Sequence, residues 1–154
     1  MKIFISYGSI ADQVTALRLQ ALAAVNGLTV YVPPAHTRQV NPALIDPQSN
    51  QRLSEADVVL GVIGVGVSES CRQELNTAIA LNKTSIVMCY PEFETMLRPY
   101  FHANLIVIDS IHPDRTEMEI VQCLKKVDVE QTKQNAILAL GTLALGLLIL
   151  APSK

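Results

Sequence analysis

The chain has 154 residues, a formal net charge of −2 and 49% hydrophobic residues, enough for one domain with a sizeable core. It contains no tryptophan, 5% aromatic residues and no cluster of lysines and arginines. Nucleic-acid binding is therefore not expected, because phosphate contacts need basic clusters and base stacking needs aromatic side chains.

The cysteines Cys71, Cys89 and Cys123 are odd in number, and Met1 leads directly into an apolar run rather than into a secretory signal. We therefore expect reduced thiols in a cytosolic domain. The spacing of cysteines and histidines matches no metal-binding pattern, so no metal site is expected. No bound cofactor is expected either.

The first elements are a strand, a helix and a second strand. Residues 2–7 are rich in β-branched and aromatic residues, which predicts a strand, and residues 28–32 predict another. Between them we expect a helix from about Asp12, which Asn26-Gly27 ends. The apolar positions of this helix are Val14, Leu17, Leu22 and Val25.

The polar, proline-rich residues 35–50 predict a loop with one broken helix, followed by a short helix. Residues 57–63 form an apolar run without alternation, which predicts a strand buried on both faces, as in a parallel sheet. Ser70 and Gln73 form a capping-box pattern and predict a helix over about 70–82.

The second half repeats the alternation of strand and helix. The expected elements, in order, are strand 85–89, helix 92–98, strand 104–108 and a helix that a Thr116/Glu119 capping box opens and that ends near Val127. Strands alternating with helices indicate a parallel sheet covered by helices on both faces. Five such units predict the flavodoxin-like strand order 2-1-3-4-5, which binds ligands at the carboxyl ends of its strands, next to the switch point between strands one and three.

Two motifs carry a family resemblance. The first is the strand at residues 3–7 (IFISY), and the second is a helix segment whose characteristic residues are Ser68, Cys71, Glu74, Leu75 and Ala78. Together they resemble the Toll/interleukin-1 receptor (TIR) domain family, prokaryotic type, whose helix motif reads roughly S-x-W-C-x-x-E-L-x-x-A. Ser70 stands where the family often has tryptophan. The resemblance covers about residues 1–127 and implies the same α/β fold.

The resemblance implies a catalytic role for Glu74. In enzymatic TIR domains the corresponding glutamate serves cleavage of the nicotinamide–ribose bond of NAD, so NAD is the expected substrate. Loss of nicotinamide leaves an oxocarbenium-like ribose, and a nearby carboxylate stabilises its positive charge. From the residues alone, a glutamate at this place is usually a solvated residue that the helix dipole favours.

Six further residues are candidates for substrate binding, namely Tyr7, Gly8, Ser9, Tyr31, Arg38 and Ser70. Gly8 follows the first strand at the switch point, where glycine lets a backbone approach a ligand closely. A turn in which Ser9 or Asp12 caps the first helix explains the same residues.

The long loop after the second strand gates the site in TIR domains and makes contacts between domains. Arg38 lies in this loop, where it would meet a phosphate, or else be an ordinary solvated arginine. Tyr31 would line the site, or else be a structural aromatic residue of its strand. We expect Cys71 to be a buried packing residue, because nothing in the sequence implies a lowered thiol pKa.

The C-terminal residues differ sharply from the rest. Residues 128–135 are a polar linker, and residues 136–151 contain no charge and Thr142 as their only hydroxyl group. Sixteen helical residues reach about 24 Å, short of a ~30 Å hydrocarbon core. We expect a hydrophobic tail helix that anchors a cytoplasmic domain to a membrane, and the alternative is a helix buried inside an oligomer.

The expected function is a TIR-type NAD glycohydrolase, a hydrolase that acts on self-assembly, in antiviral defence or cell killing. One alternative is a non-enzymatic TIR scaffold that acts through homotypic contacts. Another is an N-glycosidase similar to nucleoside deoxyribosyltransferases, which also place a glutamate after the third strand. Fold alone does not decide among the three, since function belongs to the site.

Overall fold

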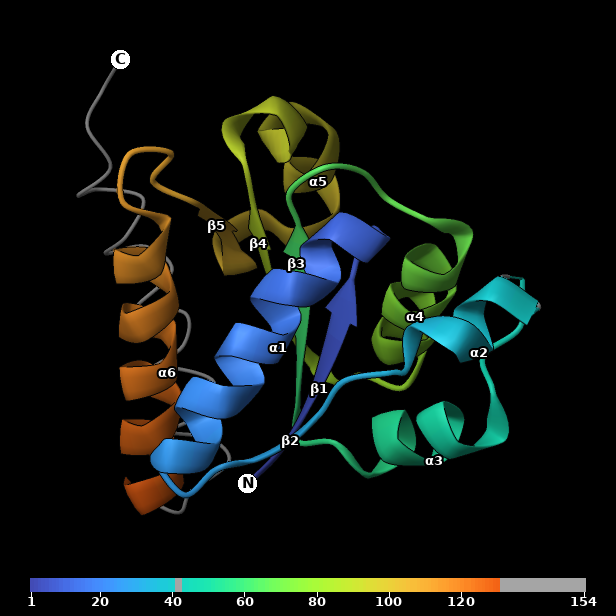
Figure 1. The fold of residues 1–154 in the computed structure, drawn as a ribbon, viewed down its shortest axis with the longest axis horizontal. Helices are drawn as coiled ribbons and strands as arrows, with labels where there is room; N and C mark the ends of the chain where they lie inside the picture. The colour runs from blue at the N-terminus through green and yellow to red at the C-terminus, as the bar shows by residue number, and fades with distance from the viewer. Residues whose placement is uncertain (41–42, 131–154) are drawn as a thin grey trace.

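The computed structural model describes residues 1–40 and 43–130. Five strands, all paired in parallel, form one sheet in the order β2-β1-β3-β4-β5 (Figure 1), which confirms the predicted class and strand order. The strands are β1 (Lys2–Tyr7), β2 (Thr29–Tyr31), β3 (Val58–Ile63), β4 (Thr84–Cys89) and β5 (Leu105–Val107). The hydrophobic tail helix expected at 136–151 lies outside the described residues.

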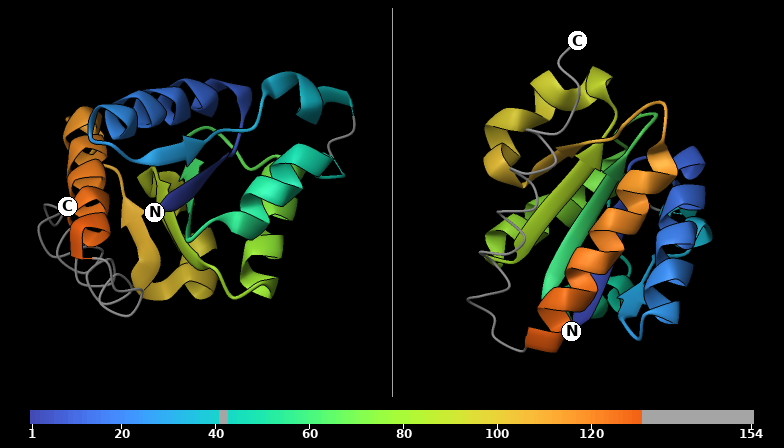
Figure 2. Two further views of the ribbon diagram at one scale, coloured as in Figure 1. Left: turned by 90° about the horizontal axis from the view of Figure 1, so that it is seen from below. Right: turned by 90° about the vertical axis from the view of Figure 1, so that its left-hand side faces the viewer.

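Helices cover both faces of the sheet. The helices are α1 (Ile10–Val25), α2 (Ala35–Val40), α3 (Pro47–Glu55), α4 (Glu69–Ala80), α5 (Glu94–Phe101) and α6 (Pro113–Glu130), with short 3₁₀ turns η1 (Pro91–Phe93) and η2 (His102–Asn104). Helices α1 and α6 lie side by side on one face, and α3, α4 and α5 lie on the other (Figures 1 and 2). Among the described helices, none is both long and apolar enough to cross a membrane.

Alternation along β1 divides the core into two layers. Ile3, Ile5 and Tyr7 belong to the layer beneath α1 and α6, whereas Phe4 belongs to the layer beneath α3, α4 and α5. Ser6 shares the face of Phe4 and meets α4. Because both faces are covered, β3 is buried along its whole length, as its apolar run predicts.

Two predicted helix starts are wrong. Helix α4 begins at Glu69, and its N-cap is Ser68, whose hydroxyl accepts from the Cys71 amide, so Ser70 lies inside the helix. Helix α6 begins at Pro113, so Thr116 is within its first turn rather than at its cap. By contrast, the prediction that Ser9 or Asp12 caps the first helix is confirmed for Ser9, which is the N-cap of α1.

Helix α1 presents an unexpected face to the core. Its buried residues are Asp12, Ala16, Leu19 and Ala23. The predicted apolar positions Val14, Leu17 and Val25 are exposed instead, and Leu22 is partly buried. Apolar residues occur on both the buried and the exposed face of α1, so its sequence does not indicate which face it buries.

Candidate active site

Glu74 lies on the second turn of α4, beside the carboxyl end of β1. The chain turns from β3 into α4 through a loop held close to β1, because the Gly8 amide donates to the Val62 carbonyl at 2.8 Å and the Ser68 amide donates to the Gly8 carbonyl at 2.7 Å. This places Glu74 at the switch point, where open α/β sheets bind their ligands.

The Glu74 carboxylate is buried and held by two groups. The residue is 2% exposed. The Ser6 hydroxyl donates to its Oε1 atom at 2.7 Å, and the Arg38 guanidinium forms an ion pair with the same oxygen. Burial raises the pKa of Glu74 above its ordinary value, and the charge of Arg38 and the two hydrogen bonds oppose that rise.

Arg38, from α2, closes over this carboxylate. Its Cζ atom lies 3.7 Å from the centroid of the Tyr7 ring, and its Nη1 donates to the Tyr7 carbonyl at 2.6 Å. The Tyr7 hydroxyl in turn donates to the Pro33 carbonyl at 2.7 Å. Within the described part of the chain, the buried Nε atom of Arg38 has no hydrogen-bond partner. The structure thus brings Tyr7, Arg38 and Glu74 together.

Gly8 and Ser9 shape the turn that supports the site. A Cβ atom on Gly8 would lie 1.9 Å from the Gly66 carbonyl oxygen, so the two backbone segments touch here. Ser9 caps α1, and its hydroxyl donates to Asp12 at 3.0 Å. Asp12 also accepts from the Val65 amide at 3.2 Å, so its carboxylate ties the start of α1 to the loop before α4.

Tyr31 and Ser70 have structural surroundings. The Tyr31 hydroxyl lies 3.1 Å from Ser49 Oγ on α3, and its ring lies 5.7 Å from that of Phe4. Ser70 is buried within α4. Of the six candidates for substrate binding, Tyr31 therefore packs against α3 and Ser70 is buried within α4.

Ser6 and Asp12 are polar site residues that the sequence analysis did not assign to the site. Ser6 is fully buried, and its hydroxyl lies 3.3 Å from Cys71 Sγ in addition to donating to Glu74. The signal for Ser6 was its place in the IFISY strand, where its side chain must share the face of α4. Asp12 carried the signal of a helix-capping residue only.

Cys71 is a packing residue in this structure. It is fully buried against Ser6 and Glu74, and burial raises the pKa of its thiol to about 12. A thiol this far from its ionised form is a poor nucleophile at neutral pH. Its placement agrees with the packing role expected from the sequence.

The site is closed in this arrangement. Glu74 and Ser6 are buried, and the Arg38 side chain is 11% exposed. A surface hollow of about 430 Å³ lies on the α5 side instead, lined by Glu94, Thr95, Arg98, Pro99 and His102. That hollow contains none of the predicted site residues.

No protein-family model matches the chain, and no curated protein matches it. The function must therefore be inferred from the fold, from the geometry around Glu74 and from the sequence motifs.

Proposed function

We propose that this chain is a TIR-type NAD glycohydrolase. The proposal is supported chiefly by the position of Glu74, whose buried carboxylate Ser6 orients at the switch point of a sheet with strand order 2-1-3-4-5. The sequence motifs around residues 3–7 and Glu74 resemble those of TIR domains, in which this glutamate serves NAD cleavage. A buried carboxylate is suited to stabilise developing positive charge, because charge interactions are stronger in a site that excludes water.

The chemistry needs one carboxylate and one water. The bond between C1′ of ribose and the nicotinamide nitrogen breaks, and nicotinamide leaves as a neutral molecule with the bonding electrons. The ionised Glu74 stabilises the oxocarbenium-like ribose that remains. Water adds at C1′ and loses a proton, giving ADP-ribose. Because the leaving group is already cationic in NAD, no strong acid is required.

Arg38 must leave Glu74 before a ribose can approach. The guanidinium is then free for the diphosphate of NAD, since arginine binds phosphate oxygens with two parallel hydrogen bonds. Its contacts with the Tyr7 ring and carbonyl give it a second anchor beside the site. The segment around α2 is therefore the gate, and Arg38 links the closed state to substrate binding.

The wider proposal follows from the resemblance and from the tail. Residues 136–151 would anchor the protein to a membrane, with the α/β domain in the cytoplasm and with self-assembly raised by the high local concentration. A small domain with an anchor suits a defence or cell-killing effector.

A non-enzymatic scaffold is the second candidate, and the closed ion pair favours it. A chain that only assembles has no need to expose Glu74, and the pair of Arg38 and Glu74 then serves the fold. The two candidates differ in whether nicotinamide is ever released.

The test is to incubate the full chain with NAD over a range of protein concentrations, free and on lipid vesicles, and to measure released nicotinamide. We expect Glu74→Gln to lose at least about 100-fold of the rate, or ~2.7 kcal/mol of transition-state stabilisation. The matched control is Glu69→Gln, on the same helix with a 36% exposed side chain, which should keep the wild-type rate. Circular dichroism verifies that both variants fold.

A Glu74→Gln protein with the wild-type rate would overturn the assignment of Glu74. A wild-type chain that never cleaves NAD, even on vesicles, would leave the scaffold as the function. Release of free base from deoxynucleosides instead of NAD would favour the deoxyribosyltransferase-like alternative.

A further inference from the structure

Ser6 is a polar side chain at a position where the fold favours an apolar one. It is fully buried on β1, on the face that packs against α4, in a layer whose members include Phe4, Val59 and Leu75. A buried hydroxyl costs free energy unless it has a hydrogen-bond partner. Ser6 has Glu74, to whose Oε1 atom it donates at 2.7 Å, so this contact accounts for a hydroxyl in the layer.

The contact between Ser6 and Glu74 depends on a close approach of α4 to the sheet. Ser6 lies opposite Gly61 in the register of β1 and β3. A Cβ atom on Gly61 would lie 3.1 Å from Val87 Cγ2 and 3.4 Å from Leu75 Cδ2, so a side chain here would crowd the contact between α4 and the strands. Leu75 follows Glu74 directly on α4. The glycine beside Ser6 thus lets the helix bring its carboxylate within reach of the hydroxyl.

Ser6 and Arg38 act on the same oxygen of Glu74 but are held in different ways. Both contact its Oε1 atom. Ser6 belongs to β1, which is paired with β2 on one side and with β3 on the other, so its position is fixed by the sheet. Arg38 belongs to α2, the gate that must withdraw before NAD can reach the carboxylate. Of these two donors, Ser6 is therefore the one that remains when the gate opens.

We propose that Ser6 is a positioning residue, which holds the Glu74 carboxylate in place while Arg38 is turned away from it. A glutamate side chain has considerable rotamer freedom, which a fixed donor restricts. The carboxylate must stay directed at C1′ of the ribose for its charge to act on the transition state. This role in the reaction rests on the proposed function, whereas the hold of Ser6 on Glu74 does not.

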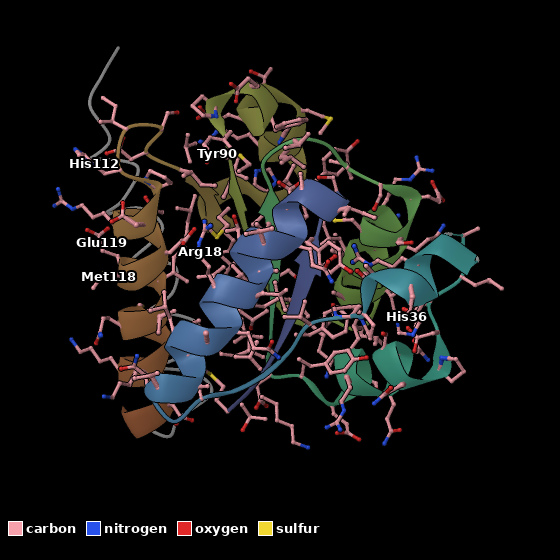
Figure 3. The ribbon with its side chains drawn as sticks, in the orientation of Figure 1. Arg18, His36, Tyr90, His112, Met118 and Glu119 are labelled. Carbon is pink, nitrogen blue, oxygen red and sulfur yellow. The ribbon has the colours of Figure 1, made fainter. Side chains whose placement is uncertain are left out.

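The hydrogen bond from Ser6 also favours the ionised form of Glu74. Burial raises the pKa of Glu74, the charge of Arg38 and the hydrogen bond from Ser6 lower it, and the charge of Asp46, the N-cap of α3, raises it. His36, the other titratable residue of α2, is exposed (Figure 3). With Arg38 withdrawn, the Ser6 hydroxyl still opposes burial and Asp46, so its removal should raise the pKa of Glu74.

Kinetics of the full chain test the role of Ser6 in the reaction. The variants are Ser6→Ala, which removes the hydroxyl, and Ser6→Thr, which keeps one. The matched control is Ser85→Ala, because Ser85 is buried near the amino end of β4 and its hydroxyl donates to the Lys83 carbonyl at 3.2 Å. Nicotinamide release is measured from pH 4 to 9 over a range of NAD concentrations, and circular dichroism verifies folding.

We expect Ser6→Ala to lower kcat about tenfold with KM nearly unchanged, and to move the rising limb of the pH profile up by about one unit. Ser6→Thr should restore both, and Ser85→Ala should change neither. Ser6→Cys, which is similar in shape but a weak donor, carries the same test if Ser6→Ala does not fold. A loss of stability without a moved limb overturns the proposal, and so does a folded Ser6→Thr protein that behaves like Ser6→Ala.

A direct titration of Glu74 separates this proposal from the proposed function. The full chain, in detergent micelles, carries carbon-13 at the side-chain carboxyl of glutamate, and Glu74→Gln identifies the resonance. In the Arg38→Ala background, which mimics the open gate, adding Ser6→Ala should raise the midpoint by about one pH unit. A raised midpoint in a chain that never cleaves NAD supports the hold of Ser6 on Glu74 and rejects the glycohydrolase. An unmoved midpoint overturns the proposal, whether or not the chain cleaves NAD.

Discussion

At the scale of single residues, the central feature is a carboxylate whose charge the fold both opposes and compensates. Burial raises the pKa of Glu74, while Arg38 and Ser6 lower it. Because the folded pKa lies above that of the unfolded chain, the folded state holds the proton more tightly. The contribution of Glu74 to stability is therefore present below the unfolded pKa and is lost as the pH rises through the folded pKa.

The same shift predicts a pH dependence of NAD cleavage. The ionised carboxylate stabilises the oxocarbenium ion, so the rate should rise with pH through a pKa above the usual glutamate value of about 4.3. Arg38→Ala should move this limb to higher pH, because the cation that lowers the pKa is gone. Rates of nicotinamide release measured from pH 4 to 9 test this, with Arg72→Ala on the outer side of α4 as control. An Arg38→Ala limb at lower pH than that of wild type contradicts it.

At the scale of elements, the site depends on a close approach between two loops. Gly8 follows β1, and Gly66 lies in the loop before α4, so their contact joins the two strands that flank the switch point. Asp12 adds its hydrogen bond from the Val65 amide. These contacts therefore fix the position at which α4 begins, and through it the position of Glu74.

Gly8→Ala should destabilise the fold and Gly66→Ala should not. A Cβ atom on Gly8 meets the Gly66 carbonyl at 1.9 Å, and backbone must move, at a cost of about 1–3 kcal/mol. A Cβ atom on Gly66 has nothing within 4 Å, so that change should stay within about 0.5 kcal/mol. Urea unfolding of both variants measures the difference, and equal free energies of unfolding would contradict the close contact.

At the scale of the whole molecule, the alternation of apolar runs and helices was sufficient to predict the sheet and its order. The apolar run at residues 57–63 predicts a strand covered on both faces, because a strand with one solvated face would alternate apolar and polar residues. For α1 the sequence allows either of two faces to be buried, since both carry apolar residues. Packing against the sheet determines that Ala16 and Leu19 are the buried ones. Likewise Ser68 and Ser70 are both capping residues by type, and backbone geometry alone selects Ser68.

The candidate site also combines features that local sequence predicts with features that depend on tertiary contacts. The sequence motif placed Cys71, Glu74 and Leu75 on one helix, and the structure confirms that placement. The pairing of Arg38 with Glu74 was not predicted, since the two residues are 36 positions apart in sequence and meet only because α2 folds back over the end of β1. Local pattern thus indicates which residues a helix presents, and tertiary contact decides which of them meet.

An ion pair joins α1 and α6 at the surface of the domain, and its loss should lower the stability of the whole domain. Glu117 has a 4% exposed side chain and accepts from Arg18, whose side chain is 53% exposed. Arg18→Ala leaves that buried carboxylate without its cation, and because water screens Arg18 in part we expect a loss of about 1–2 kcal/mol. The control is Arg115→Ala, which removes an exposed pair with Glu119 and should cost under about 0.5 kcal/mol. Urea unfolding at neutral pH compares them, and an Arg18→Ala protein as stable as Arg115→Ala would show that Glu117 is satisfied without Arg18.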